Sequence, residues 1–249
     1  MNDSLSRKQR EIRQREGEIL NHAEKLLHDH GFHGVTMERL AELTACSRGT
    51  IYQHFTNKED LCAAVCLDNS SQLVELFQRA VTFDGESREQ IVAIAIAHWL
   101  FVSLNPTRFR NFQSIMSSAF REKLPAERET QLFQREETLF KLVTRPVQKA
   151  VDDGKLVLHQ FHSVAEVVMS LWAHSFGHLY LLTTHIPFQD LGVEAPKGVL
   201  FKSSHTFLDG LGWQPLAADF DYRSTFERLQ QELFAPEFTA LHPPQTAQR

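Results

Sequence analysis

The segment TMERLAELTACSRGTIYQHFTNK, residues 36–58, decides the fold of the N-terminal part of this chain. Its apolar residues recur at helical spacing in two short runs, which predict helices over Met37–Leu43 and Arg48–Phe55. Thr36 and Ser47 stand immediately before these runs, where a hydroxyl can accept a hydrogen bond from an N–H group of the first turn. Two short helices joined by a tight turn form a helix-turn-helix, whose second helix can enter the major groove of DNA.

The second helix of this segment is expected to be polar on its outer side. Ile51 and Phe55 are four residues apart and should face inward. The side chains left to point outward or sideways can hydrogen-bond bases and phosphates, and they are Arg48, Thr50, Tyr52, Gln53 and His54. Gly49 has no side chain, so a DNA backbone can approach it closely, and Lys58 could hold a phosphate at the start of the next helix.

Composition allows a globular protein but excludes one that coats nucleic acid through bulk charge. The chain has 249 residues, enough for a small domain and a larger one, and 42% of them are hydrophobic. Its formal net charge is -5. A local basic surface remains compatible with that total, because phosphate binding depends on how charge is distributed.

The sequence favours a soluble, cytoplasmic protein without a membrane partner. Three cysteines (Cys46, Cys62 and Cys66) are too few, and odd in number, for a disulfide framework. The N-terminus lacks the apolar core of a signal peptide. The most apolar stretch, Val164–Leu182, is interrupted by Glu166 and two histidines, so we expect no membrane span.

Helical periodicity dominates the whole chain and predicts an all-α fold, with an N-terminal helix-turn-helix domain and a larger C-terminal helical domain. Gly31 is expected to end the first helix in a left-handed conformation, and Asn57 to cap the fourth. The expected helices cover residues 7–30, 37–43, 48–55, 58–81, 87–104, 106–118, 125–153, 163–184, 198–211 and 222–234. We predict a DNA-binding domain over residues 7–60, an effector-binding and dimerisation domain over 61–234, and a disordered tail over 235–249.

Residues 19–65 resemble the DNA-binding domain of the TetR family of regulators. The matching elements are Ile19-Leu20, Ala23, Gly31-Phe32, Val35-Thr36, Leu40-Ala41, Ser47 to Tyr52, His54-Phe55 and Asn57 to Leu61. The resemblance implies a homodimer whose C-terminal domain binds an inducer. It also implies phosphate contacts at Thr36, Tyr52, His54 and Lys58, and contacts with base edges or nearby backbone at Arg48, Gly49, Thr50 and Gln53.

The turn of the motif departs from the family pattern at two positions. The family often has glycine where this chain has Ala45, and valine where it has Cys46. An alanine held in a left-handed turn costs about 1 kcal/mol, so the placement of the second helix could differ slightly.

The beginning of the chain is rich in basic residues: Arg7, Lys8, Arg10, Arg13 and Arg15. They could contact the minor groove or phosphates beside the recognition helix. The alternative is a solvated start of the first helix, balanced by Glu11, Glu16 and Glu18.

The larger domain is predicted to hold a small-molecule effector, because aromatic residues and histidines cluster on two of its helices. The candidate effector-binding residues are His98, Trp99, Trp172, His174 and His178. The alternative is ordinary core packing and dimer contact. His174 and His178 share the i, i+4 spacing of a metal-ligand pair without the full HExxH pattern, and Cys62 and Cys66 are also four apart. Metal or redox sensing is therefore an alternative, but we predict no metal and no cofactor.

Two late helices, residues 163–184 and 198–211, are the expected dimer interface. Their candidate apolar faces consist of Val167, Val168 and Leu171 on one helix and Phe201, Phe207 and Leu208 on the other. A twofold dimer predicts a palindromic operator.

An enzyme is not predicted, since GxSxG, P-loop and HExxH motifs are missing, and a pure protein-interaction module would not need the helix-turn-helix residues. The predicted function is a transcriptional regulator, most simply a repressor that a small-molecule effector releases from its operator.

Overall fold

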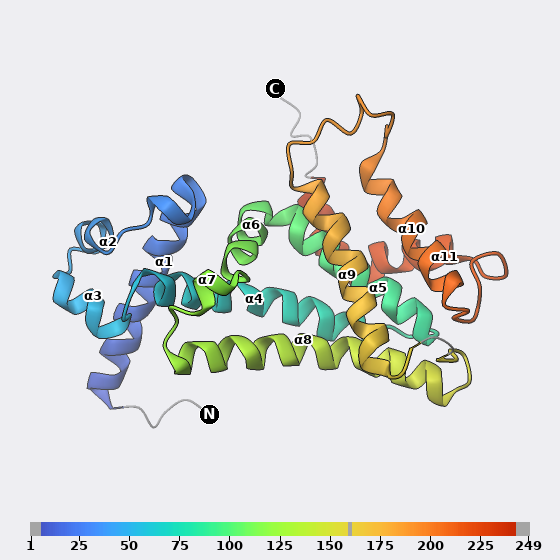
Figure 1. Ribbon diagram of the computed structural model, residues 1–249, viewed down its shortest axis with the longest axis horizontal. Coiled ribbons are helices and arrows are strands. Elements are labelled where there is room, and N and C mark those ends of the chain that lie inside the picture. The colour runs from blue at the N-terminus through green and yellow to red at the C-terminus, as the bar shows by residue number, and fades with distance from the viewer. Residues whose placement is uncertain (1–5, 159–160, 243–249) are drawn as a thin grey trace. The chain divides into compact units, whose positions relative to one another are not determined.

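The computed structural model describes residues 6–158 and 161–242, and in these ranges the chain consists of helices without a β-strand (Figure 1). The predicted all-α class is confirmed. The elements are α1 (Arg7–Gly34), α2 (Met37–Leu43), α3 (Arg48–His54), α4 (Lys58–Ala80), α5 (Ser87–Leu104), α6 (Pro106–Ile115), α7 (Ser118–Arg121), α8 (Ala126–Asp152), α9 (Val164–Leu182), α10 (Pro196–Gly210), α11 (Tyr222–Arg228), a π-helical turn η1 (Leu229–Leu233) and α12 (Ala235–Leu241).

The chain forms two compact units whose limits differ from the predicted boundary at residue 60. The first unit comprises Met1–Ser71 with Thr107–Arg135, and the second comprises Gln72–Pro106 with Glu136–Arg249. Helices α4 and α8 therefore each contribute residues to both units. Helix periodicity does not indicate which core a long helix packs against, so the sequence could not predict that α4 and α8 are shared between the two units.

A capping box that the sequence analysis did not predict begins the first helix, and a glycine that it did predict interrupts the helix near its end. Ser6 caps α1 by accepting a hydrogen bond from the Gln9 N–H (3.3 Å), while the Gln9 side chain accepts one from the Ser6 N–H (2.9 Å). Gly31 has φ +62° and breaks the helix at the expected residue, after which one more short helical segment leads to Gly34.

The core of the first unit fixes α3 against its neighbours. Ile51 and Phe55 expose no surface, as predicted, and they share one hydrophobic cluster with Ile19, Leu40 and Leu61. Because α3 buries only this narrow apolar edge, the rest of the helix is free to present polar groups.

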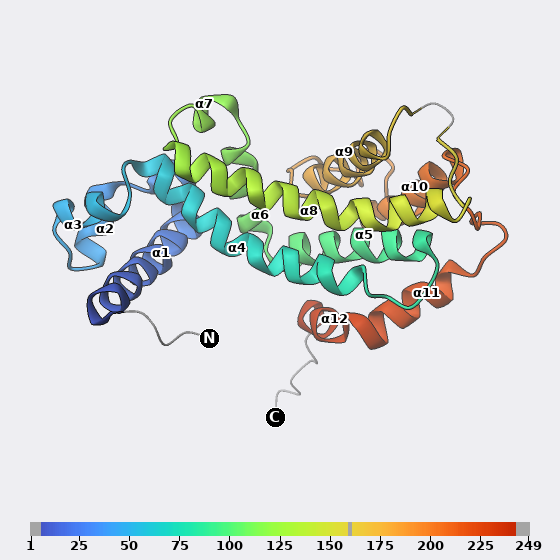
Figure 2. The same cartoon turned by 90° about the horizontal axis from the view of Figure 1, so that it is seen from below.

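The second unit is organised around α5, most of which is buried. Helices α9 and α12 both pack against α5, and α9 also packs against α10 (Figure 2). Arg88 on α5 exposes no surface; its guanidinium lies 2.7 Å from the Asp209 carboxylate and donates to the Trp213 carbonyl oxygen at 2.6 Å. A buried cation must be paired in this way, so Arg88 ties α5 to the end of α10.

The predicted disordered tail is wrong for residues 235–241, which form α12. Phe238 is buried and its ring lies 5.9 Å from Trp99 and 5.7 Å from Phe226, which gives the segment an apolar anchor. Residues 243–249 of the predicted tail lie outside the described residues.

Within the described part of the chain, no single helix is long and apolar enough to cross a membrane. Helices α5 and α6 taken together reach that length and hydropathy, but the pair is sharply bent.

Candidate nucleic-acid interface and ligand cavity

The turn between α2 and α3 closes the helix-turn-helix with an alanine in the left-handed region. Ala45 has φ +51°, and among the described residues other than glycine it is alone in having a positive φ. The N–H of Cys46 donates to the Ala41 carbonyl oxygen (3.1 Å), and that of Ala45 donates to Glu42 (3.3 Å). These two bonds form a Schellman motif, which normally carries glycine at the left-handed position. The predicted strain at Ala45 is therefore present, and the turn still forms.

The start of α3 is held by its own hydroxyls. Ser47 caps the helix, and its Oγ accepts from the Thr50 N–H (3.0 Å) and lies 2.8 Å from the Thr50 hydroxyl. The space around Gly49 is open, since a Cβ atom there would meet only the Ser47 Oγ, at 3.6 Å. The first turn of α3 can thus be approached closely without displacing protein atoms.

The outer face of α3 carries the polar side chains expected there. Tyr52 is 49% exposed, and Gln53 is exposed beside it. Arg48 is also exposed, but its guanidinium lies 3.3 Å from the Glu38 carboxylate of α2. Helix periodicity and capping patterns do not indicate this pair. Any contact of Arg48 with a base or phosphate has to compete with Glu38.

The remaining predicted DNA-binding residues flank this face. Thr36 is exposed and caps α2 by accepting from the Arg39 N–H at 3.1 Å. His54 is half-buried at the end of α3. The Lys58 ammonium lies 4.1 Å from the centre of the Phe32 ring. All eight predicted residues therefore belong to α3, to the cap of α2, or to the start of α4.

A buried ion pair positions the loop that carries Lys58. Asp60 is buried; one of its oxygens lies 2.7 Å from Nε of Arg128, and the other accepts from the Thr56 N–H at 2.9 Å. Asn57 caps α4, as predicted, by accepting from the Asp60 N–H at 2.8 Å. The charge of Asp60 suits the helix dipole, but its main partner is a distant arginine that sequence patterns do not indicate.

The basic residues at the start of α1 are partly engaged with acidic neighbours. Nε of Arg7 lies 2.9 Å from Glu11, and Arg15 lies 3.7 Å from Glu18. Arg15 also donates to the Cys46 sulfur at 3.4 Å, which links α1 to the turn before α3. Exposed pairs of this kind are weak, so both earlier interpretations of the basic segment remain predictions.

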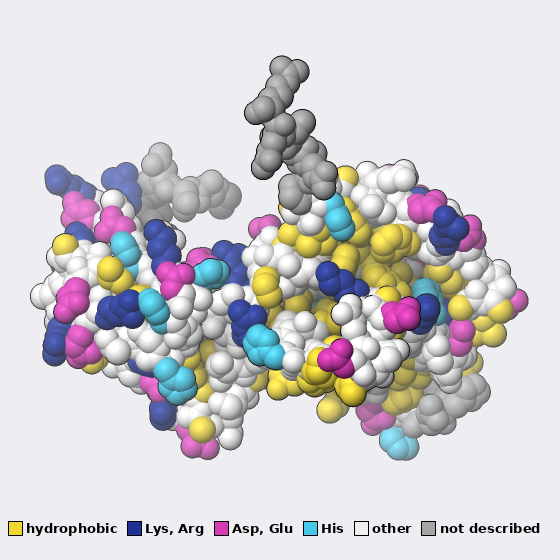
Figure 3. Space-filling model, turned by 90° about the horizontal axis from the view of Figure 1, so that it is seen from above, with side chains coloured by type: hydrophobic (Ala, Val, Ile, Leu, Met, Phe, Trp, Pro, Cys, Tyr) yellow, Lys and Arg dark blue, Asp and Glu magenta, His cyan; other side chains and the backbone are white. Residues whose placement is uncertain are grey.

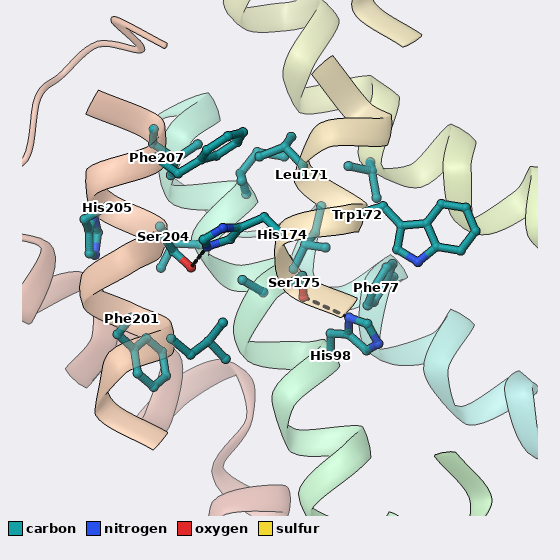
Figure 4. Close-up of a pocket in the computed structure, with 17 residues that line it drawn as sticks. Phe77, His98, Leu171, Trp172, His174, Ser175, Phe201, Ser204, His205 and Phe207 are labelled. Carbon is teal, nitrogen blue, oxygen red and sulfur yellow. Dashed lines mark hydrogen bonds between the residues drawn. The ribbon is translucent and has the colours of Figure 1, made fainter. Parts of the chain in front are cut away.

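The second unit contains a cavity of about 70 Å³ between α4, α5, α8, α9 and α10 (Figure 4). Its lining is mostly aliphatic and aromatic, with histidine and serine as the polar members. The lining residues are Phe77, Ile91, Val92, Ile94, Ala95, His98, Val143, Leu171, Trp172, His174, Ser175, Leu200, Phe201, Ser204, His205, Phe207 and Leu208.

The cavity includes three of the five predicted effector-binding residues: His98, Trp172 and His174. Trp99 is not in the lining and instead packs 6.0 Å from the Phe201 ring. His178 is not in the lining either, and its Nε2 lies 3.0 Å from the Ser203 hydroxyl.

Five further lining residues were not assigned to the effector site in the sequence analysis. They are the aromatic residues Phe77, Phe201 and Phe207 and the hydroxyl residues Ser175 and Ser204. Ser175 follows His174 directly, so the histidine cluster was the available signal for it. The others come from different helices, which only the fold brings together.

The cavity histidines are uncharged at neutral pH. Burial lowers the pKa of His98 to about 4, and its Nδ1 lies 3.0 Å from the Ser175 hydroxyl. Burial, helped by the neighbouring His178, also lowers the pKa of His174. The cost of holding a charge away from water explains both shifts.

Comparison with known proteins identifies the N-terminal part of the chain. Residues 19–65 match the sequence profile of the bacterial regulatory proteins of the tetR family, over α2, α3 and their flanking helices.

Residues 19–65 are thus similar to the regulatory proteins of the TetR family.

Similar proteins of this family share the N-terminal segment. The transcriptional repressor AcnR of Corynebacterium diphtheriae is 36% identical over 66 residues, which cover 26% of this chain and 35% of AcnR. The transcriptional activator FasR of Mycolicibacterium smegmatis is 27% identical over 97 residues, which cover 39% of this chain and 44% of FasR. The chain thus matches about a third to under half of the length of these relatives.

A likeness of fold extends through most of the chain. A regulatory protein of the tetR family from Rhodococcus RHA1 superposes with a TM-score of 0.60 at 14% identity, over 80% of this chain and 98% of the other. At this identity the likeness concerns the fold alone.

Two observations concern the metal and redox alternatives. Within residues 6–158 and 161–242, no group of three or more His, Cys, Asp or Glu side chains could hold a metal ion. Cys62 and Cys66 are buried; burial raises the pKa of Cys62 to about 12 and raises that of Cys66 as well. Such thiols are poor nucleophiles.

Several apolar side chains predicted to form the dimer interface are buried within the protomer instead. Val167, Val168 and Leu208 are buried inside the second unit. The exposed apolar side chains of α9 include Met169, which is 65% exposed, and Tyr180. Figure 3 shows hydrophobic side chains, in yellow, gathered over the second unit on the face turned to the reader. The helix pattern located α9 correctly but could not tell its inner from its outer apolar stripe.

Proposed function

We propose that this protein is a sequence-specific DNA-binding transcriptional repressor that acts as a cytoplasmic homodimer and leaves a palindromic operator when a small molecule occupies its cavity. The observation that carries the proposal is the outer face of α3. Ile51 and Phe55 bury one edge of the helix, so Tyr52 and Gln53 face solvent beside the open surface of Gly49. A recognition helix needs this arrangement.

The proposed roles of the DNA-binding residues follow their positions. Thr36, Tyr52, His54 and Lys58 flank the recognition helix and would hold phosphates. Arg48, Gly49, Thr50 and Gln53 lie on α3 itself and would meet base edges or the nearby backbone. Because the chain is acidic overall, affinity would depend on these few contacts and on the spacing of two such helices in a dimer.

The exposed apolar stripe of α9 is the proposed dimer contact, together with the outer face of α10. Met169, Tyr180 and Leu181 on α9 and Val199 on α10 are large apolar side chains with at least two-fifths of their surface exposed. Burying such a surface against a second copy would remove it from water and create a twofold axis. A twofold dimer reads two inverted half-sites, hence the palindromic operator.

The proposed switch is a shift between two populations of the dimer. A ligand that favours one conformation can release DNA only by the difference of its affinities for the two conformations. Helix α4 begins at Lys58, beside the recognition helix, and its Phe77 lines the cavity. We therefore propose α4 as the element that couples the effector to DNA.

A double substitution tests the DNA interface. We expect Tyr52→Ala with Lys58→Ala to weaken binding to an operator selected from random DNA. The slope of log K against log salt concentration should decrease by about two, because two phosphate contacts are lost. Circular dichroism should show unchanged folding, since neither Tyr52 nor Lys58 belongs to the hydrophobic core of the first unit. Lys141→Ala, an exposed lysine of α8 in the second unit, serves as the control. Unchanged operator affinity in the double variant would contradict the assignment of this surface.

Activation is the second candidate outcome of DNA binding, because the relative FasR is an activator. A reporter gene behind the selected operator distinguishes the two. We expect expression to rise when the regulator is deleted; a fall would assign activation.

A further inference from the structure

The cavity of the second unit offers no charge to a ligand. None of its seventeen lining side chains, all within the described residues, is a lysine, arginine, aspartate or glutamate. Burial is the main cause that lowers the pKa values of all three lining histidines (His98, His174 and His205), so their rings are neutral at neutral pH. A carboxylate, phosphate or ammonium group placed here would lose its water without gaining an opposite charge, which is strongly unfavourable.

Four of the five polar side chains that line the cavity form two hydrogen-bonded pairs that share α9, and the fifth is His205 of α10. Ser175 pairs with His98 of α5 at 3.0 Å, and His174 pairs with Ser204 of α10 at 3.3 Å (Figure 4). The second pair is long for a hydrogen bond that involves a hydroxyl. A ligand oxygen that bonds to the Ser204 hydroxyl or the His174 ring would therefore displace only a weak hydrogen bond. Displacing the shorter hydrogen bond between Ser175 and His98 would cost more.

The remaining lining favours a flat or compact apolar molecule. Phe77 of α4, Trp172 of α9, and Phe201 and Phe207 of α10 supply aromatic walls from three helices. The His174 ring stacks on Phe207, with centroids 5.1 Å apart and an interplanar angle of 10°. With about 70 Å³ of space, the cavity suits a group the size of a single ring.

We infer that the effector is a small uncharged organic molecule, apolar except for one hydroxyl or carbonyl oxygen that hydrogen-bonds with Ser204 and His174. This inference rests on the proposed function in so far as it takes the cavity to be the effector site. It specifies the ligand class of that site: the charge of the ligand, its size and the position of its polar atom.

A series of single-ring compounds of different charge tests the first part. Benzyl alcohol is neutral, benzoate is an anion and benzylammonium is a cation at pH 7. Binding to the full chain is measured by ligand-detected NMR and by the change in tryptophan fluorescence, to which Trp172 in the cavity wall contributes. We expect benzyl alcohol to bind at least about tenfold more tightly than either ion, because neither ion finds a counter-charge. An ion that binds as tightly as the alcohol, or an alcohol that fails to bind up to its solubility limit, would overturn the inference.

Neighbouring serines of α10 provide a matched pair of variants for the polar atom. Ser204 lines the cavity, while Ser203 bonds to His178 and does not. Ser204→Ala should weaken benzyl alcohol binding about three- to tenfold and leave toluene, which lacks the oxygen, unaffected. Ser203→Ala should change neither. Equal losses for benzyl alcohol and toluene in Ser204→Ala, or no loss for either, would overturn the proposed hydrogen bond.

The outcome can be separated from that of the proposed function. Operator binding is measured on the same protein without any ligand. If the unliganded protein does not bind its selected operator, the proposed function fails while the ligand measurements retain their meaning. If it binds DNA and the charged compounds occupy the cavity, only the inference about the ligand fails.

Discussion

Replacing Ala45 by glycine should stabilise the first unit. Ala45 occupies the left-handed position of the turn before α3, with φ +51°, and its side chain is exposed. For a residue with a Cβ atom this conformation costs about 1–2 kcal/mol, and glycine removes that cost. Glycine also gives the unfolded chain more conformational entropy, which lowers the free energy of unfolding by about 0.4–1 kcal/mol. The expected net gain is about 0.5–1 kcal/mol in the free energy of unfolding.

Urea denaturation followed by circular dichroism measures this gain. With a slope of about 2 kcal/mol per molar urea, the midpoint should rise by about 0.3–0.5 M. Ala126→Gly is the control, because Ala126 is an exposed alanine in the same unit, at the first position of α8 and without a positive φ. Glycine relieves no backbone strain there, so Ala126→Gly should not raise stability. If Ala45→Gly gains no more stability than Ala126→Gly, the argument from backbone strain is refuted.

Further predictions concern charge, pH and thiol reactivity. Glu38→Gln should tighten operator binding about two- to fivefold by freeing the arginine at the start of α3, and a fluorescence anisotropy titration that shows weaker binding would contradict this. The pKa of His98 is about 4 in the folded protein and about 6.5 in the unfolded chain, so the unfolded chain takes up the proton first. The neutral His98 ring therefore contributes its full stabilisation above pH 6.5, and the free energy of unfolding falls by roughly 3 kcal/mol as the pH is lowered toward 4. His98→Gln should make the free energy of unfolding less dependent on pH in this range. Iodoacetamide at pH 8 should label Cys46 in the native protein and reach Cys62 and Cys66 only after unfolding, as mass spectrometry of peptides would reveal.

The helix-turn-helix could be predicted almost residue by residue, because its determinants are local. The capping hydroxyls of Thr36 and Ser47, and the i, i+4 spacing of Ile51 and Phe55, act within one or two turns of the chain. The left-handed turn at Ala45 was also visible, since the family pattern has glycine there. What could not be seen was the Arg48–Glu38 pair, which joins side chains of two helices.

The ligand cavity depended far more on the tertiary structure. Composition pointed to α5 and α9, and His98, Trp172 and His174 do line the cavity. Yet Trp99, adjacent to His98 in the chain, packs on Phe201 outside the lining. An apolar helix offers several faces, and periodicity alone does not say which face meets a cavity, a core or solvent.

The helical class, the recognition motif and the position of most helices follow from neighbouring residues, because capping and helical periodicity are local properties of the chain. The tertiary structure alone decided that Thr107–Arg135 joins the first unit, that α12 docks through Phe238, and that Met169 rather than Val167 faces outward on α9. It also gathered Phe77 and Ser204 around one uncharged cavity. Contacts of this kind join residues far apart in the chain, and their energy depends on which faces meet when the helices pack.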